Sequence, residues 1–273
     1  MMIIFLIFFL VLHTVTGEYN ELLAKIALNI SQSTYCLDTA SNWECATCSV
    51  NNKYQKLIQN NGEQVVIGFN IEYDTIFVGF RGSTNIQNWI DNIRVSQIQP
   101  YDDRSISVEK GFYNLFMSLK KDIIKEINDV SIKYQTNNLL ITGHSLGGAL
   151  STVLAFDLFY VQNSKMEIQL ITFGSPRVGN EEFVSAFNNF PIYSNRVTHY
   201  YDIVPHIPQQ FLNYNHISQE IWYNEENNQY KICNDQDNIE DPTCSDSCSP
   251  TRCTSTSDHG NYLNISMGTD GDC

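Results

Sequence analysis

Apolar residues recur along the chain at two spacings, that of strands and that of helices. Short apolar runs predict strands at 64–69, 75–80, 139–142, 168–173 and 196–201. Apolar residues three or four positions apart predict helices at 18–33, 111–134 and 181–190, and a further helix that follows residues 143–147 and runs to about 162. Because strands alternate with helices from 111 to 202, we predict an α/β protein with a mostly parallel central sheet flanked by helices. The pair at 64–80 adds antiparallel strands at its N-terminal side.

The first 17 residues have the pattern of a secretory signal peptide. Residues 1–12 are almost entirely apolar, residues 13–17 are small and polar, and Val15 and Gly17 suit the positions before a cleavage site. The apolar run is shorter than the roughly 20 residues of a membrane span. Positive charge there comes only from the amino terminus, so a retained anchor stays open as an alternative. We predict a signal peptide at 1–17 and, since no repeat or linker divides the rest, one domain at 18–273.

The cysteines agree with export. The chain has 8 cysteines, all beyond the predicted signal peptide: Cys36, Cys45, Cys48, Cys233, Cys244, Cys248, Cys253 and Cys273. An even number in a secreted chain predicts disulfides, whose pairing the spacing does not determine. A metal or redox site at Cys45-x-x-Cys48 is the alternative, but a second such pair with suitable histidines is absent from the sequence, so we expect no metal. Asn29 and Asn264 begin glycosylation sequons that are usable on export.

The charge of the chain limits its partners. The formal net charge is −14, with an isoelectric point near 4.7. Such a surface repels nucleic acid and anionic membranes but permits neutral substrates, including an uncharged lipid surface. The sequence has no glycine-rich phosphate-binding loop, so we expect no nucleotide cofactor.

A candidate nucleophile lies between a predicted strand and a predicted helix. Residues 143–147 read Gly-His-Ser-Leu-Gly, which is typical of a sharp turn that presents the serine at its tip. Ser145 would then lie at a helix N-terminus, where free N–H groups stabilise a developing negative charge. The structural alternative is a serine that only caps the helix.

A nucleophilic serine needs a base and a group that orients the base. In this kind of fold the order along the chain is serine, then an acid, then histidine. Asp202 follows the strand at 196–201, at the sheet edge where functional loops gather. His259 is the histidine that comes after the cysteine-rich segment, and we take it as the base. His216 also follows Asp202 and remains its competitor, and Asp202 has the alternative role of starting a turn before proline.

Two further elements surround this candidate centre. Candidate donors to an oxyanion are the N–H of Leu146 and the N–H and hydroxyl of Ser83, which follows the strand at 75–80. For Ser83 the alternative role is a helix cap. Just beyond, one face of a short amphipathic helix carries four apolar residues: Ile86, Trp89, Ile90 and Ile93. This helix either packs on the core or acts as a lid that turns its apolar face outward at a lipid surface.

The motifs together resemble the class 3 lipases, the fungal-type triacylglycerol lipases of the α/β-hydrolase fold. The resemblance runs from about residue 60 to 273, in the family's order. The matching stretches are Phe80–Thr84 with Trp89 and Asp91, Lys110–Phe112, Thr142–Ala149, Gly174–Gly179, Asp202–Pro208 and Asp258–His259.

This resemblance implies several roles. Ser145 would be the nucleophile, with Asp202 and His259 as partners and Ser83 and Leu146 as oxyanion donors. It favours a lid at 85–95 and places His216 in a structural segment. It also implies the disulfides Cys36–Cys273 and Cys45–Cys48. The four cysteines from 233 to 253 exceed the family's usual single pair, and the expected pairing there is Cys233–Cys244 and Cys248–Cys253.

We therefore predict a secreted or vesicle-stored serine hydrolase of carboxylic esters, a triacylglycerol lipase, that acts as a monomer on neutral lipid or at a lipid–water interface and needs no cofactor. A phospholipase A1 and a feruloyl-type esterase share the motifs and remain alternatives, although the apolar stripe at 86–93 favours lipid esters. A catalytically inactive binding protein is a further alternative from another class, against which the presence of Ser145, Asp202 and His259 argues.

Overall fold

The computed structural model describes residues 19–36, 42–60, 62–93, 95–235, 239–249, 251–268 and 273. The predicted signal peptide at 1–17 lies outside these residues. Within them, every helix is too short or too polar to cross a membrane.

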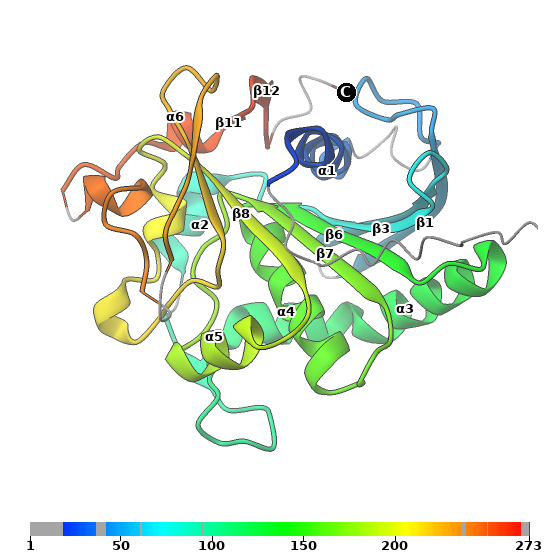
Figure 1. Cartoon of the computed structure of the whole chain (residues 1–273), viewed down its shortest axis with the longest axis horizontal. Helices are drawn as coiled ribbons and strands as arrows, with labels where there is room; N and C mark the ends of the chain where they lie inside the picture. The colour runs from blue at the N-terminus through cyan, green and yellow to red at the C-terminus, as the bar shows by residue number, and fades with distance from the viewer. Residues whose placement is uncertain are drawn as a thin grey trace, which may run out of the picture.

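An eight-stranded sheet runs through the fold, with helices on both of its faces (Figure 1). Its strands lie in the order β1 (Asn52–Asn60), β2 (Glu63–Asn70), β3 (Thr75–Phe80), β6 (Asn138–His144), β7 (Glu167–Phe173), β8 (Tyr193–His199), β9 (Glu220–Tyr223) and β10 (Tyr230–Ile232). The strands from β3 to β9 pair in parallel, whereas β1, β2 and β3 pair antiparallel, as do β9 and β10. The predicted α/β architecture, with antiparallel strands on its N-terminal side, is confirmed.

The helices divide between the two faces of the sheet. Helix α1 (Glu21–Ser33) covers one face, and α3 (Lys110–Tyr134), α4 (Leu146–Tyr160) and α5 (Glu181–Asn188) cover the other (Figure 1). The remaining elements are short: α2 (Ile86–Asn92), β4 (Gln97–Ile98), β5 (Val108–Glu109), η1 (Val204–His206), η2 (Gln210–Leu212), η3 (Ser245–Cys248), α6 (Thr256–His259), β11 (Asn261–Tyr262) and β12 (Ile265–Ser266).

Two hydrophobic cores result from the alternation of side chains along the strands. In β3, Val78 and Phe80 join the core beneath α3 and α4, whereas Phe77 points into the core beneath α1. Leu140 in β6 likewise faces α1 while its neighbour Ile141 faces α4. Both faces of each central strand are buried, which is why these strands appear in the sequence as continuous apolar runs.

The edge strands were missed by the pattern analysis. The apolar pattern predicts no strand at 52–60, but these residues form β1 at one edge; β10 at the other edge and its inner neighbour β9 are likewise not predicted. All three residues of β10 are exposed, and most of β1 is exposed or only partly buried. An edge strand of this kind is decided by pairing with its neighbour and not by its own hydrophobic pattern.

Four disulfides join the cysteines in the pairs expected: Cys36–Cys273, Cys45–Cys48, Cys233–Cys244 and Cys248–Cys253. The first ties the end of α1 to the C-terminal residue. The last two lie in the segment that leads to α6.

Replacement of Phe156 tests the packing of the core beneath α4. This residue is fully buried, and its ring stacks on Phe183 with centroids 4.4 Å apart. Phe156→Ala should lower the free energy of unfolding in urea by about 3–5 kcal/mol, because a cavity replaces the ring. Ile132→Ala on the exposed side of α3 is the control and should change it by no more than about 0.5 kcal/mol. Equal effects of the two variants would contradict the placement of this core.

Candidate active site

Ser145 lies in a sharp turn between β6 and α4. Its backbone has φ +59° and ψ −130°, a strained conformation that holds the serine at the tip of the turn. The turn brings Gly143 against Gly147, since a Cβ on Gly143 would lie 2.3 Å from the carbonyl carbon and oxygen of Gly147. The predicted strand, turn and helix are all present, and Leu146 is the first residue of α4.

Asp202 and His259 meet beside this turn. The Nδ1 atom of His259 lies 2.9 Å from Oδ2 and 3.1 Å from Oδ1 of Asp202. Asp202 follows β8, and a bridge between Asp202 and Ser255 brings the start of α6 alongside it. Because a carboxylate only accepts hydrogen bonds, Nδ1 carries the proton and Nε2 is left as the acceptor. This tautomer is the one that a general base needs.

Tyr262 is a partner of Asp202 that the sequence analysis missed. Its hydroxyl donates to Oδ2 of Asp202, and the N–H of Val204 donates to Oδ1 at 2.8 Å. Burial, followed by the nearby Asp202 charge, raises the pKa of the Tyr262 phenol well above its usual value, so it stays a donor. Its only signal in the sequence is its place three residues after His259.

Gly174 makes room for these groups. It follows β7 with φ +55°, and a Cβ there would lie 2.7 Å from the Tyr262 hydroxyl, 2.8 Å from Oδ2 of Asp202 and 2.9 Å from Nδ1 of His259. Both the positive φ and the lack of space require glycine. In the sequence Gly174 begins the motif Gly174–Gly179, which carries no signal of this role.

Ser145 and His259 each keep one reactive atom free. The Oγ of Ser145 and the Nε2 of His259 are buried and have no hydrogen-bond partner among the described residues. Unsatisfied buried polar atoms are costly and need an explanation. The ring of His144, next to Ser145, stacks on the His259 ring with centroids 4.4 Å apart, so the base lies close to the turn. An acceptor nitrogen and a hydroxyl that are both free suit proton transfer in a site whose final contacts form only with substrate.

The two candidate oxyanion donors belong to segments that touch, the loop after β3 and the turn into α4. A Cβ on Gly82, next to Ser83, would lie 3.0 Å from the Cβ of Ser145, so the loop after β3 packs against the turn that carries Leu146. The alternative role of Ser83 as the cap of the next helix is wrong. Asn85 is that cap, and its side chain accepts from the N–H of Asn88 at 3.0 Å.

The predicted lid is a short helix, α2, over a pocket. None of its residues is fully buried, but Trp89 packs against the core, and its ring stacks on Phe112 with centroids 6.4 Å apart. The helix ends at Asn92, with Ile93 as its C-cap. A pocket of about 500 Å³ lies between α2 and the start of α3 and extends to Leu146.

The competing histidine, His216, is occupied elsewhere. Its Nε2 lies 2.8 Å from the Pro205 carbonyl oxygen, to which it donates, and burial holds its pKa well below the usual range. Nearby, Arg177 and Glu240 form a buried pair through two contacts of 2.7 Å each, and the Arg177 guanidinium also donates to the Pro208 carbonyl. The pair ties the loop after β7 to the segment around Glu240, and the bond to Pro208 ties the same loop to the chain after Asp202.

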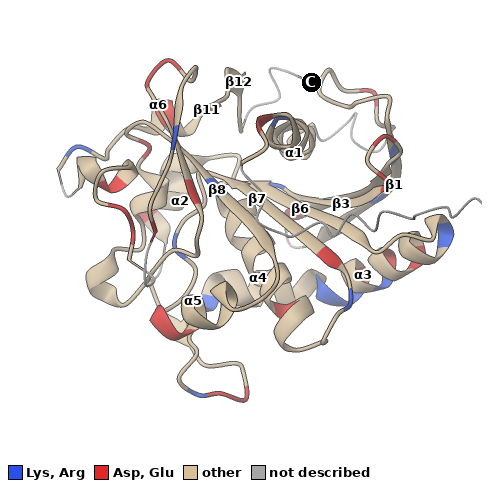
Figure 2. Cartoon of the chain, in the orientation of Figure 1, with Lys and Arg blue, Asp and Glu red and all other residues tan. Residues whose placement is uncertain are grey.

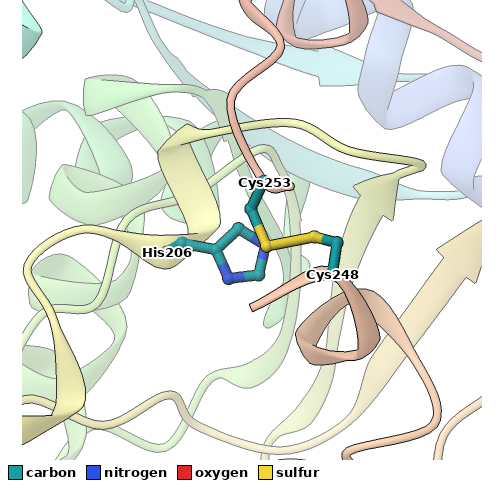
Figure 3. A group of neighbouring side chains, drawn as sticks. All are labelled: His206, Cys248 and Cys253. Carbon is teal, nitrogen blue, oxygen red and sulfur yellow. A yellow bond between two sulfur atoms is a disulfide. The ribbon is translucent and has the colours of Figure 1, made fainter. Parts of the chain in front are cut away.

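Two clusters have the residue types of metal sites. Figure 3 shows His206 beside Cys248 and Cys253, and the other cluster joins Glu220 to Cys233 and Cys244. In both clusters the cysteines form a disulfide with each other. Their sulfurs are therefore not thiolates, the form that binds metal. Burial also lowers the pKa of His206 to about 4.

The fold and this arrangement define a serine hydrolase of the α/β-hydrolase class. Comparison with protein-family models matches residues 77–212 to the family "Lipase (class 3)". The lipase of Rhizomucor miehei is 29% identical over 262 residues, which cover 92% of this chain and 70% of that protein. The lipase of Rhizopus niveus is 27% identical over 88% of this chain and 62% of its own length.

Solved structures agree with these relatives. The structure of lipase II from Rhizopus niveus superposes with a TM-score of 0.83 at 25% identity, over 91% of this chain and 96% of that one. A second solved structure, described as a triacylglycerol lipase whose catalytic centre is formed by a serine protease triad, superposes with a TM-score of 0.80 at 26% identity, over 92% of this chain and 96% of its own. The chain belongs to the class 3 lipase family, as its sequence motifs predicted.

The Arg177–Glu240 pair makes a testable contribution to stability. Burial raises the pKa of the Glu240 carboxyl, but the Arg177 charge and hydrogen bonds outweigh burial and hold the pKa below its ordinary value. A lowered folded-state pKa stabilises the fold above the unfolded pKa, near 4.5, and this contribution is lost as the pH falls. Glu240→Gln should cost about 3 kcal/mol at pH 7, as for a broken buried pair.

Urea unfolding between pH 7 and pH 3 checks this effect. The wild type should lose stability faster than Glu240→Gln as the pH falls below about 4.5, so that the two curves converge. Parallel curves would contradict the role of the pair. The control is Glu21→Gln, which removes a carboxylate from the exposed Lys25–Glu21 pair and should leave the slope nearly unchanged.

Proposed function

We propose that this protein is a secreted carboxylic ester hydrolase that cleaves neutral acylglycerols with Ser145, His259 and Asp202. The observation that carries the proposal is the free hydroxyl of Ser145 at a strained turn, next to a histidine whose other nitrogen is held by a buried carboxylate.

The first half of the reaction forms an acyl-enzyme. The Oγ of Ser145 attacks the ester carbonyl carbon while Nε2 of His259 takes its proton, and Asp202 stabilises the resulting imidazolium. The carbonyl oxygen becomes an oxyanion, which the N–H groups of Leu146 and Ser83 and the Ser83 hydroxyl stabilise. When the tetrahedral intermediate collapses, the bond to the alcohol oxygen breaks and His259 returns the proton to the leaving glyceride.

The second half releases the fatty acid. Water attacks the carbonyl carbon of the acyl group bound to Ser145 and gives a proton to Nε2 of His259. A second oxyanion forms, which the groups of Leu146 and Ser83 stabilise again. Collapse breaks the bond to Oγ, which takes the proton back from His259. The α4 N-terminus favours both oxyanions, because its N–H groups lack partners within the helix.

The pocket and the charges favour neutral lipid as the substrate. Trp89, Ile93, Phe112 and Leu115 make one side of the pocket apolar, next to the oxyanion donor Leu146. Lys and Arg are conspicuous along α3, whereas Asp and Glu are spread over much of the remaining surface (Figure 2). The net charge of −14 repels anionic lipids and products.

Relatives carry names that agree with this substrate class. A Fusarium solani relative, 35% identical over 54% of this chain and 43% of its own length, is named a secreted mono- and diacylglycerol lipase. A rice relative, 28% identical over 50% of this chain, is named a phospholipase A1. Phospholipase activity is the less favoured alternative here, because the family's triacylglycerol lipases match over far more of the chain.

The same proposal includes export, modification and oligomeric state. The signal peptide at 1–17 directs the chain to an oxidising compartment, where four disulfides form. Asn264 lies exposed in the turn between β11 and β12 and accepts a glycan there. Asn29 lies half-buried in α1, where a glycan has less room. The mature enzyme acts as a monomer.

Loss of the nucleophile tests the reaction. Ser145→Ala should reduce kcat/KM on p-nitrophenyl butyrate by roughly 10⁴-fold or more, as in other serine hydrolases that lose this group. Ser118→Ala, an exposed position on α3, is the control and should keep wild-type activity. If Ser145→Ala keeps more than a tenth of the wild-type rate, the assignment of the nucleophile fails.

A comparison of substrates tests the lipid class. Initial rates on emulsified triolein, phosphatidylcholine vesicles and methyl ferulate should be highest on triolein, because the pocket is apolar and uncharged lipid meets no repulsion. Rates on a short-chain triglyceride should rise above its solubility limit if α2 opens at a lipid surface. A preference for methyl ferulate would refute the lipase assignment.

A further inference from the structure

His144 connects the turn of Ser145 to the base. The sequence places it next to Ser145 with no role, but in the structure its ring is buried. Its Nε2 lies 2.8 Å from the backbone carbonyl oxygen of His259, and its Nδ1 lies 2.9 Å from the hydroxyl of Tyr35. The two imidazole rings also stack, with an angle of 30° between them.

The hydrogen bonds determine the tautomer of His144. A carbonyl oxygen only accepts, so Nε2 carries the proton and donates to His259. Nδ1 is then an acceptor, and the Tyr35 hydroxyl donates to it. Burial, followed by the charge of a protonated His259, lowers the pKa of His144 well below its usual range, and the ring stays neutral. Burial likewise raises the pKa of the Tyr35 phenol, which keeps its proton.

Tyr35 extends this connection to the oxyanion loop. The N–H of Gly82 donates to the phenol oxygen, and a Cβ on Gly82 would lie only 2.2 Å from that oxygen. Tyr35 itself follows α1 and precedes Cys36, which the disulfide to Cys273 anchors. One phenol therefore joins the loop before Ser83, the turn before Ser145 and, through His144, the backbone of His259.

We propose that Tyr35 and His144 are positioning residues that set the base and an oxyanion donor relative to Ser145. This inference rests on the proposed function. The base lies at the end of α6, a single turn of four residues, so its own helix gives little restraint. The bond from His144 fixes the carbonyl of His259, while the bond that Nδ1 of His259 donates to Asp202 fixes its ring. Small displacements of such groups are costly in rate, because reaction requires near-attack geometry.

The positioning role is tested by the kinetics of variants at Tyr35 and His144 on soluble p-nitrophenyl butyrate. Tyr35→Phe removes only the phenol oxygen and should lower kcat about 10- to 30-fold, as for one lost hydrogen bond of positioning, with KM within about twofold. His144→Leu should lower kcat further, by roughly 100-fold. His144→Gln should recover part of that loss, since its amide N–H can still donate to the His259 carbonyl.

The control is Tyr101→Phe, because Tyr101 is equally buried but its hydroxyl has no partner among the described residues. It should keep kcat within about twofold of wild type. The Tm of Tyr35→Phe should match that of Tyr101→Phe to within a few degrees.

Each outcome decides the matter. If the wild type does not hydrolyse esters, the proposed function itself fails. If the wild type is active and both Tyr35→Phe and His144→Leu keep kcat within twofold, the positioning role is overturned while the function stands. If His144→Gln is as weak as His144→Leu and the kcat losses follow falls in Tm, the residues serve stability alone and the positioning role is again overturned.

Discussion

The buried contact between Asp202 and His259 is the constraint on which the arrangement of this molecule depends. The two residues are 57 positions apart, Asp202 in the chain after β8 and His259 at the end of α6. A buried carboxylate is tolerable only when it is fully hydrogen-bonded, and Asp202 receives bonds from His259, from Tyr262 and from the N–H of Val204. Gly174 leaves the space that this cluster occupies. The parallel sheet brings these loops to one edge, and the polar contacts determine how they meet there.

Further buried polar contacts hold the loops around this centre. Arg177 and Glu240 join the segment after β7 to the loop that the Cys233–Cys244 disulfide closes, and the Arg177 guanidinium also reaches the loop after Asp202. Two disulfides close the chain from 233 to 253, just before α6. On the other side, Tyr35 and His144 link α1 to the turn of Ser145. Loops alone would leave these groups mobile, and each of these contacts reduces that freedom.

The candidate centre is covered in this structure. Ser145 is 1% exposed and His259 is 2% exposed, so a lipid ester reaches them only if part of the cover moves. Helix α2 suits that movement, because it is short, has no fully buried residue and contacts the core mainly through Trp89 and Ile93. An element with so little buried surface opens at low free-energy cost. The proposed lid, α2, therefore covers the apolar pocket through a weakly held contact.

The sequence by itself determined the central strands, the long helices and the order of Ser145, Asp202 and His259, because these depend on local periodicity and on motifs that a short segment carries. It did not determine the edge strands β1 and β10 or the strand β9 beside β10, since pairing with a neighbouring strand decides them. It left His216 as a competitor of His259 for the role of the base, and it left a helix cap as the alternative role of Ser83. Only the tertiary structure brought His259 to Asp202, gave the cap to Asn85 and joined Tyr35, His144 and Tyr262 to the site. Those contacts connect residues far apart in the chain, and the hydrogen bonds that select among them exist only once the sheet has brought their loops together.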